Sequence, residues 1–280
     1  MKKILLPTDF SENAMNAITY ALKLFTHEEC TFYILNTYTP IIYQAEYLQL
    51  STAQFGLLDT AKDISLKGLA TVKESIDKKF INPKHTIKTI SVFNNLIPEM
   101  ESLIERENID LVIMGTQGAS NIQGVLFGSN TVHVFKNVKA PVLAVPSAFE
   151  FEPLHQILFP SDYEVNFQEE QIMTLVSLAA KYHANVNVLH VNYGEELSEK
   201  QQKNKQKLET YFNHVSHLFH DIKNNNVVDA INDFQKKTNV NLLVMINNKH
   251  SFFENLFFQS KINQIGFHLN IPFLVIPSKL

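Results

Sequence analysis

The chain is poor in the residues and motifs that mark several protein classes. Cys30 is the only cysteine among its 280 residues, so an intramolecular disulfide is excluded and a reducing compartment is favoured. Cys30 directly precedes an apolar run, and we interpret it as a core residue, not as a redox centre. No run of about 18 apolar residues is present, so no transmembrane helix is expected.

Charge and N-terminal composition narrow the expected partners. The formal net charge is −4 and no strongly basic block occurs, which argues against nucleic-acid binding. After two lysines, the N-terminal apolar stretch has only three residues before Pro7, too few for a secretory signal peptide. With 45% hydrophobic and 19% charged residues, we expect a soluble, cytoplasmic protein that binds neither nucleic acid nor membrane.

What the chain does contain is a glycine-spaced loop behind a short apolar run. Residues 111–114 (LVIM) are followed by Gly115 and Gly118, and nine residues later by Gly128 and Ser129. Glycine lets backbone N–H groups approach an anion, and a helix starting near Ser129 would add about half a positive charge. The expected ligand is a phosphate group, most simply that of a nucleotide; the alternative is that these glycines only permit turns.

Three apolar segments of the first half return in the same order in the second half. The pairs are residues 4–9 (ILLPTD) with 157–162 (ILFPSD), 111–114 with 242–245, and 140–147 (APVLAVPS) with 271–278 (IPFLVIPS). A repeat of this length indicates a tandem duplication of whole domains. We expect the domains to span residues 1–149 and 154–280.

Apolar runs alternate with helical patterns in each half. In the first half we expect strands at 3–7, 31–35, 87–92, 111–114 and 142–145, and helices from Ser11, at 53–79 and at 98–107. In the second half we expect strands at 156–159, 185–190, roughly 227–228, 242–245 and 273–276, with the polar stretch 194–207 as the start of a long helix. Such alternation predicts a mostly parallel sheet with helices on both faces.

Taken together, these motifs resemble the universal stress protein family over almost the whole chain, as two copies. The strand ending in Pro-x-Asp, the Gly-x2-Gly-x9-Gly-Ser loop and the closing Ala-Pro-Val-Leu-Ala-Val strand occur in the family's order. The resemblance implies an α/β fold with two tandem five-stranded parallel-sheet domains, Rossmann-like and of the adenine nucleotide alpha hydrolase type. Their strand order would be 3-2-1-4-5, with the ligand crevice between the first and fourth strands.

The resemblance also implies an adenine-nucleotide site in the first half. The glycines and Ser129 match the phosphate and ribose loop, Asn130 stands beside the same phosphates, and Thr37 stands where the family places an apolar residue against adenine. The expected binding residues are Pro7, Thr8, Asp9, Thr37, Met114, Gly115, Gly118, Gly128, Ser129 and Asn130. The expected cofactor is ATP or another adenine nucleotide, with Mg²⁺ as an optional companion; ATP against AMP stays open.

The second half departs from this pattern at the loop. Aligning Met114 with Met245 places Ile246 at the position of Gly115, Lys249 at that of Gly118 and Gln259 at that of Gly128, and only Ser260 keeps its counterpart. These side chains should fill the space that a triphosphate needs. We therefore expect no ATP binding through this loop, although Asp162 survives. Another ligand, or a packing role alone, stays open for this half.

The closing strand of each half is an apolar sheet edge, which favours pairing. The resemblance implies that such domains pair through this strand. We therefore expect an intramolecular pseudo-twofold pair, with the strand from Val142 to Val145 against the strand from Phe273 to Ile276. A homodimer beyond this pair is an open alternative.

Two weaker patterns have competing interpretations. His214, His217 and His220 recur every three residues on an expected helix, where they could bind a metal or form a polar helix face; we favour the polar face because no matching Cys or carboxylate motif accompanies them. The aromatic-rich connection from Tyr38 to Phe55 is either a lid or partner contact, or an ordinary packed connection.

The sequence favours binding over catalysis. Gly-x-Ser-x-Gly and Gly-x4-Gly-Lys motifs are both absent, and no Lys or Arg occurs from Gly115 to Ser129. Because phosphoryl transfer needs positive charge and an oriented nucleophile, ATP hydrolysis should be slow. The leading interpretation is a nucleotide-binding stress-response or signalling protein; the alternatives are a nucleotide-free interaction or scaffold protein and a slow ATPase.

Overall fold

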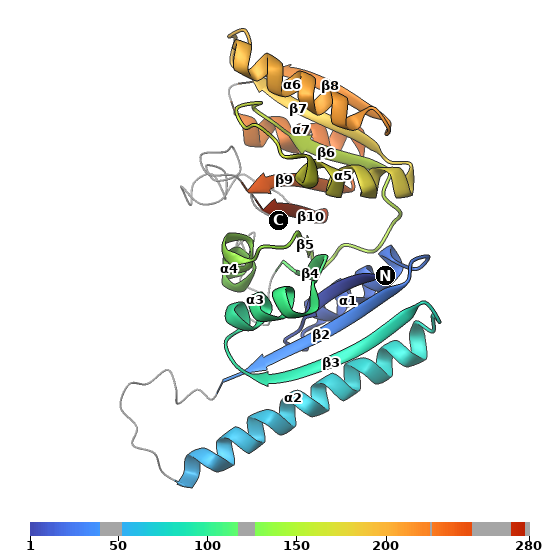
Figure 1. Cartoon of the computed structure of the whole chain (residues 1–280), viewed down its shortest axis with the longest axis vertical. Helices are drawn as coiled ribbons and strands as arrows, with labels where there is room; N and C mark the ends of the chain where they lie inside the picture. Colours follow the sequence, from blue (N-terminus) through green and yellow to red (C-terminus); the bar gives the residue numbers. More distant parts are fainter. Residues whose placement is uncertain (40–51, 117–126, 225, 248–269, 278–280) are drawn as a thin grey trace.

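The computed structural model describes residues 1–39, 52–116, 127–224, 226–247 and 270–277. These residues form alternating strands and helices along both halves of the chain (Figure 1). The strands are β1 Lys2–Pro7, β2 Cys30–Tyr38, β3 His85–Phe93, β4 Leu111–Gly115, β5 Val142–Val145, β6 Gln156–Pro160, β7 Asn185–Asn192, β8 His217–Lys223, β9 Leu242–Asn247 and β10 Phe273–Pro277. The helices are α1 Glu12–Leu24, α2 Thr52–Lys79, α3 Leu96–Glu107, α4 Ser129–Asn137, α5 Glu169–Tyr182, α6 Glu199–Phe212 and α7 Val227–Thr238.

All ten strands belong to one sheet with the order β3-β2-β1-β4-β5-β10-β9-β6-β7-β8. Every neighbouring pair is parallel except β5 and β10. Each half therefore has the strand order 3-2-1-4-5 in its own numbering, which confirms the expected α/β fold class. The edge strands β3 and β8 lie at opposite ends of the molecule (Figure 1).

The two halves meet where β5 runs antiparallel to β10. Leu143 lies opposite Leu274, flanked by the pairs Ala144–Phe273 and Val142–Val275. Since Leu143 and Leu274 occupy the same position of the repeat, each closing strand meets its own counterpart. A pseudo-twofold axis therefore passes through this pair of leucines, as in an isologous contact between two subunits.

Helices cover both faces of the sheet, and each face has one hydrophobic core that runs through both halves. On one face, residues of α1 and α2 such as Ile18 and Val72 belong to the same buried cluster as Leu175 of α5 and Phe212 of α6. On the other face, α3, α4 and α7 contribute to a second cluster. Each core therefore continues across the join between β5 and β10.

Three phenylalanines fill the second core at the join. Phe127, just before α4, stacks on Phe273 of β10 with ring centroids 5.7 Å apart and an interplanar angle of 25°. Phe135 of α4 meets Phe127 and Phe273 edge-on, at 5.2 and 5.7 Å. Because Phe127 and Phe135 come from the first half and Phe273 from the second, this cluster ties the residues next to Gly128 to the other half.

An ion pair joins the halves on the opposite face. The Lys181 ammonium, at the end of α5, pairs with Glu28 and donates a hydrogen bond of 2.8 Å to the Leu24 carbonyl at the C-terminus of α1. Tyr182 donates to the same carbonyl. A cation is favourable at a helix C-terminus, so the end of α1 supplies part of the contact between halves.

The first helix follows the sequence pattern closely. Ser11 caps α1 by accepting a hydrogen bond of 3.2 Å from the Ala14 N–H. Ala14, Ile18 and Ala21 are buried on the face expected for them. Cys30 is buried at the start of β2, and burial raises the pKa of its thiol to about 11, as expected for a core residue.

The predicted third strand of the second half is wrong. Residues 227–228 begin α7, and the third strand is β8, ten residues earlier. β8 is a half-buried edge strand. Its residues His217 and His220 are three apart, a spacing that also occurs on one face of a helix, so the sequence pattern did not predict a strand here. The polar stretch after Gly194 also behaves differently from the expectation, because α6 begins only at Glu199, capped by Ser198.

Among the described residues, no helix combines the length and hydropathy needed to cross a bilayer. Most of the aromatic-rich connection from Tyr38 to Phe55 lies outside these residues, so its two interpretations stay untested. The same holds for the second-half loop positions Lys249, Gln259 and Ser260.

Replacing Phe273 with alanine should remove the contact between the halves that the three rings make. Because Phe273 is fully buried, we expect the free energy of unfolding to fall by about 3–5 kcal/mol. Urea denaturation followed by circular dichroism measures this change. Leu218→Ala, at a 55% exposed position of β8, is the control and should change stability by less than about 1 kcal/mol; equal effects of both variants would contradict the account.

The ion pair between Glu28 and Lys181 should make the free energy of unfolding depend on pH in the acid range. Burial pushes the pKa of Glu28 up, but the ammonium groups of Lys181 and Lys2 outweigh it and hold this pKa below its ordinary value. The pair therefore stabilises the fold above the unfolded-state pKa of about 4.3, and this stabilisation is lost as the pH falls through the lower folded-state pKa.

Glu28→Gln should flatten this part of the pH profile, measured as the free energy of unfolding between about pH 5 and pH 3. Glu74→Gln, at an exposed ion pair with Lys78, is the matched control because exposed pairs contribute little. An unchanged slope in the Glu28 variant would refute the ion pair's role.

Candidate functional site

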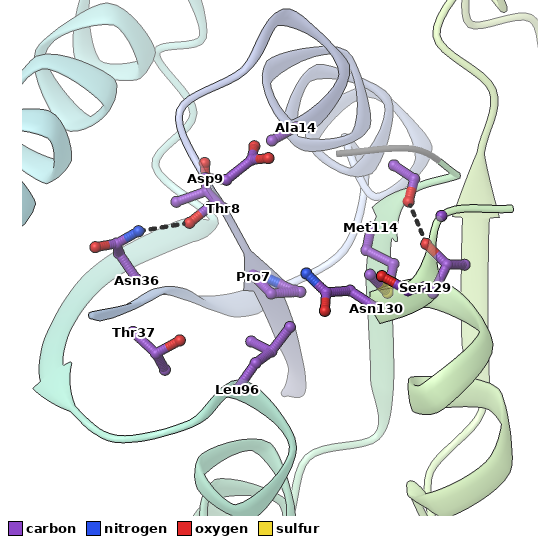
Figure 2. A pocket seen from close by; sticks show the side chains of 13 residues that line it. Pro7, Thr8, Asp9, Ala14, Asn36, Thr37, Leu96, Met114, Ser129 and Asn130 are labelled. Atoms are coloured by element: carbon purple, nitrogen blue, oxygen red, sulfur yellow. Dashed lines mark hydrogen bonds between the residues drawn. The ribbon is translucent and has the colours of Figure 1, made fainter. Parts of the chain in front are cut away.

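A cavity lies at the carboxyl ends of β1 and β4, where the strand order of the first half reverses. Figure 2 shows side chains from β1, β2, α3, β4 and α4 around one space. Of the predicted binding residues, the structure brings together Pro7, Thr8, Asp9, Thr37, Met114, Gly115, Gly128, Ser129 and Asn130. Gly118, the tenth, lies outside the described residues.

Four further residues that no sequence motif indicated line the same cavity: Ala14, Asn36, Leu96 and Thr131. Asn36 and Thr131 adjoin predicted residues along the chain, so counting one neighbour further would have found them. Leu96 is different, because it begins α3 and reaches the cavity from a helix that carries no motif. Only the folded sheet brings it beside Thr37 (Figure 2).

The end of β1 is held by a tight turn. The Thr8 N–H donates to the Leu35 carbonyl at 2.8 Å, and the Phe10 N–H donates to the Thr8 hydroxyl at 3.0 Å. Phe10 has a φ of 65°, a left-handed backbone conformation that residues other than glycine rarely adopt. The Asn36 amide then donates to the Thr8 carbonyl at 2.8 Å, seen as a dashed line in Figure 2. These bonds fix Asp9 at the mouth of the cavity.

Gly115 is a glycine because α1 lies against it. A Cβ built at this position would lie 3.1 Å from the Asn13 carbonyl oxygen and 3.2 Å from its carbon, both backbone atoms. Such contacts are tighter than ordinary packing, and helix backbone moves aside less readily than the end of a flexible side chain. The close approach therefore places the end of β4 directly beside the start of α1.

The first turn of α4 is tied to the strand that precedes the loop. The Gly128 N–H donates to the Thr116 carbonyl at 2.8 Å. The Thr131 hydroxyl lies 3.2 Å from the Gly115 carbonyl and 3.1 Å from that of Thr116. The N–H groups of this helical turn have no acceptor within the helix, and they lie at the cavity, where Ser129 and Asn130 are lining residues. The geometry is that of an anion-binding helix N-terminus.

The charge of the cavity is low. Among its described lining residues, Asp9 is the only ionisable side chain, and none is Lys or Arg. A carboxylate is an acceptor only, so Asp9 suits the hydroxyl or amine groups of a ligand. Any positive potential must come from backbone N–H groups and the α4 dipole.

The equivalent position of Gly115 in the second half holds a buried side chain. Gly115 pairs with Val145, and Ile246 pairs with Ile276 in the same register, so Ile246 takes the place of Gly115 as expected. The connection to the first helix is also longer in the second half: residues 161–168 separate β6 from α5, whereas residues 8–11 separate β1 from α1.

The three histidines do not share a helix, so that expectation is wrong. His214 lies in a turn after α6, and His217 and His220 belong to β8, where residues three apart point to opposite faces. His217 Nδ1 donates to the Val215 carbonyl at 3.0 Å, and His220 Nε2 donates to the Asn187 side-chain oxygen at 2.9 Å. Within the described part of the chain, no group of three or more metal-binding side chains occurs.

Comparison with known proteins gives a family model and two relatives that match the first half of the chain or about half of its length. The family model described as "Universal stress protein family" matches residues 1–146. Two relatives come from Methanocaldococcus jannaschii. Universal stress protein MJ0577 is 31% identical over 154 residues, which is 51% of this chain and 94% of the relative. Universal stress protein MJ0531 is 28% identical over 148 residues, which is 51% of this chain and 81% of the relative.

A solved universal stress protein from Archaeoglobus fulgidus DSM 4304 is similar over both halves. It covers 98% of this chain and 98% of its own length, with a TM-score of 0.69 and 19% identity, a similarity that shows the fold. The family model covers 146 of the 280 residues. Because this is more than half of the chain, the protein belongs to the universal stress protein family.

Proposed function

We propose that the first half of this chain binds ATP or a related adenine nucleotide and thereby serves a stress-response or signalling role. The observation that carries the proposal is the convergence of the β1 end, the β4 end and the α4 N-terminus on one cavity. In the sequence, the β1 end at Pro7 lies far from the β4 end at Gly115 and from the start of α4 at Ser129. An N-terminus with exposed N–H groups beside a glycine with no room for a side chain suits a phosphate chain.

Each side of the cavity suits one part of the nucleotide. Gly115, Gly128, Ser129 and Asn130 would face the phosphates, and Mg²⁺, where it accompanies ATP, would neutralise part of the phosphate charge. Asp9 would accept hydrogen bonds from ribose or base. Thr37 and Leu96, on the far side from Ser129 in Figure 2, would lie against the base.

The chemistry of the lining supports binding more than catalysis. Its described residues offer neither a cationic side chain for a developing phosphate charge nor a histidine as a general base. The proposal therefore includes no fast hydrolysis. We further propose that residues 1–149 form the nucleotide-binding domain. Residues 154–280 would form a second domain whose nucleotide loop is degenerate, joined to the first through β5 and β10.

Thermal unfolding with and without Mg²⁺-ATP tests the proposal. At a ligand concentration 100 times the dissociation constant, the nucleotide should add about 2.7 kcal/mol to the stability of the folded state. Gly128→Gln should remove this shift, because its side chain would fill the space before α4. No shift with any nucleotide at millimolar concentration would favour the scaffold alternative, and steady phosphate release lost in Gly128→Gln would favour the slow ATPase.

Gly115→Ala should weaken both the fold and the site. The new methyl group must push the Asn13 backbone away, at a cost of about 1–3 kcal/mol. This shift would widen the phosphate cradle, by which we mean the space between Gly115 and the N-terminus of α4. We expect a lower unfolding temperature and weaker ATP binding by isothermal titration calorimetry. Ile246→Val, at the matching position of the second half, should leave ATP affinity unchanged; a normal affinity in Gly115→Ala would argue against the cradle.

A further inference from the structure

The second half also has a cavity at the end of its first strand. Seven described residues line it, from the β6 end, from β7 and the residue after it, and from the start of α7. Its volume is about 170 Å³, against about 250 Å³ for the first-half cavity. The two cavities occupy equivalent places in the repeat, since Pro160 pairs with Leu189 as Pro7 pairs with Leu35.

The turn that follows β1 at the first cavity is repeated after β6 with the same hydrogen-bond pattern. The Ser161 N–H donates to the Leu189 carbonyl at 2.9 Å, and the Tyr163 N–H donates to the Ser161 hydroxyl at 3.1 Å. Tyr163 has a φ of 57°, as Phe10 has 65°. His190 takes the place of Asn36, with its Nδ1 3.0 Å from the Ser161 carbonyl. A strained turn kept by a different set of side chains indicates that its geometry, which places Asp162, is still used.

On the side that would receive phosphates, the position of the first-half glycine is filled by a side chain. Ile246, at the Gly115 position, is only 5% exposed and belongs to the hydrophobic core. The next side chain, Asn247, is occupied elsewhere, since its amide donates to the Phe135 carbonyl at 2.8 Å. No described lining residue is Lys or Arg, so nothing in this part of the chain compensates for the lost cradle.

The remaining walls have become more apolar. Val191 stands at the position of Thr37, and Val227 begins α7 as Leu96 begins α3. Tyr193 also lines the cavity, and 61% of its surface is exposed. An aromatic ring at the rim and branched aliphatic side chains inside are suited to a flat ring system.

Among the described lining residues, Asp162 is the one acidic side chain. Asp162 lines the cavity, and its Oδ1 accepts a hydrogen bond of 3.0 Å from the Glu164 N–H. A carboxylate has about four acceptor sites, so Asp162 keeps capacity for a ligand donor. Burial raises the pKa of this carboxyl, so a hydrogen-bond donor from a ligand would stabilise the charged form.

We propose that the second half binds an unphosphorylated purine nucleoside, with the base between Val191, Val227 and Tyr193 and an N–H or O–H group donating to Asp162. The base end of a nucleotide site would thus have been kept, whereas Ile246 replaces the glycine of the phosphate end. The equivalence of the two cavities rests on the function proposed for the first half, and the second ligand goes beyond that function.

Two matched variants separate the cavities. Leu96→Glu and Val227→Glu each place a carboxylate at the first residue of a helix, directly after an asparagine N-cap. Both positions are half-buried, and an acidic residue is tolerated in a first helical turn. Adenosine and Mg²⁺-ATP are titrated separately into both full-length variants by calorimetry, with circular dichroism and thermal unfolding as checks of folding.

In Leu96→Glu, adenosine should bind with a stoichiometry of one, and a saturating excess of ATP should not displace it. In Val227→Glu, this ATP-resistant binding should weaken at least tenfold. Val191→Glu serves as a second variant should Val227→Glu unfold. Absence of adenosine binding to folded Leu96→Glu, or its displacement by ATP, overturns the second site. Loss of ATP binding in Val227→Glu would instead count against the proposed function of the first half.

Discussion

The antiparallel contact between β5 and β10 is the interaction on which the architecture depends. A five-stranded parallel sheet ends at an apolar closing strand, and an uncovered edge of this kind is prone to pair with other chains. Here each closing strand covers the other, with Leu143 against Leu274. The pairing turns two sheets into one and lets each face carry a single core.

The two halves share some structural features and differ in others. The turn after the first strand is the same in both halves, with matching hydrogen bonds and a left-handed residue at Phe10 and Tyr163. The approach of the first helix to the fourth strand is not the same, because the longer connection before α5 accompanies a buried isoleucine at the glycine position. The divergence therefore lies in helix placement more than in the sheet.

Much of the fold could be predicted because buried parallel strands are continuous apolar runs. Residues 111–114 and 242–245 belong to this class, and the convergence of Asp9 with Gly115 follows from the strand order alone. Edge strands carry a weaker signal. β8 is partly exposed on both faces, so its histidines suggested a helix.

Other features depend on contacts between segments that carry no shared pattern. Nothing local to Gly115 indicates that the Asn13 backbone lies 3.1 Å from its missing side chain. Leu96 reaches the first cavity, and Phe127 stacks on Phe273, only because the sheet brings distant segments together. These relations are tertiary, and a single sequence does not contain them.

The continuity of the two cores has a consequence for how the molecule comes apart. Domains joined by a small polar interface usually unfold one at a time. In this chain each core includes side chains of both halves, and Asn16 of α1 also holds the connecting segment through the Pro146 and Phe149 carbonyls. Opening one half would expose apolar surface of the other, so we expect the two halves to unfold together.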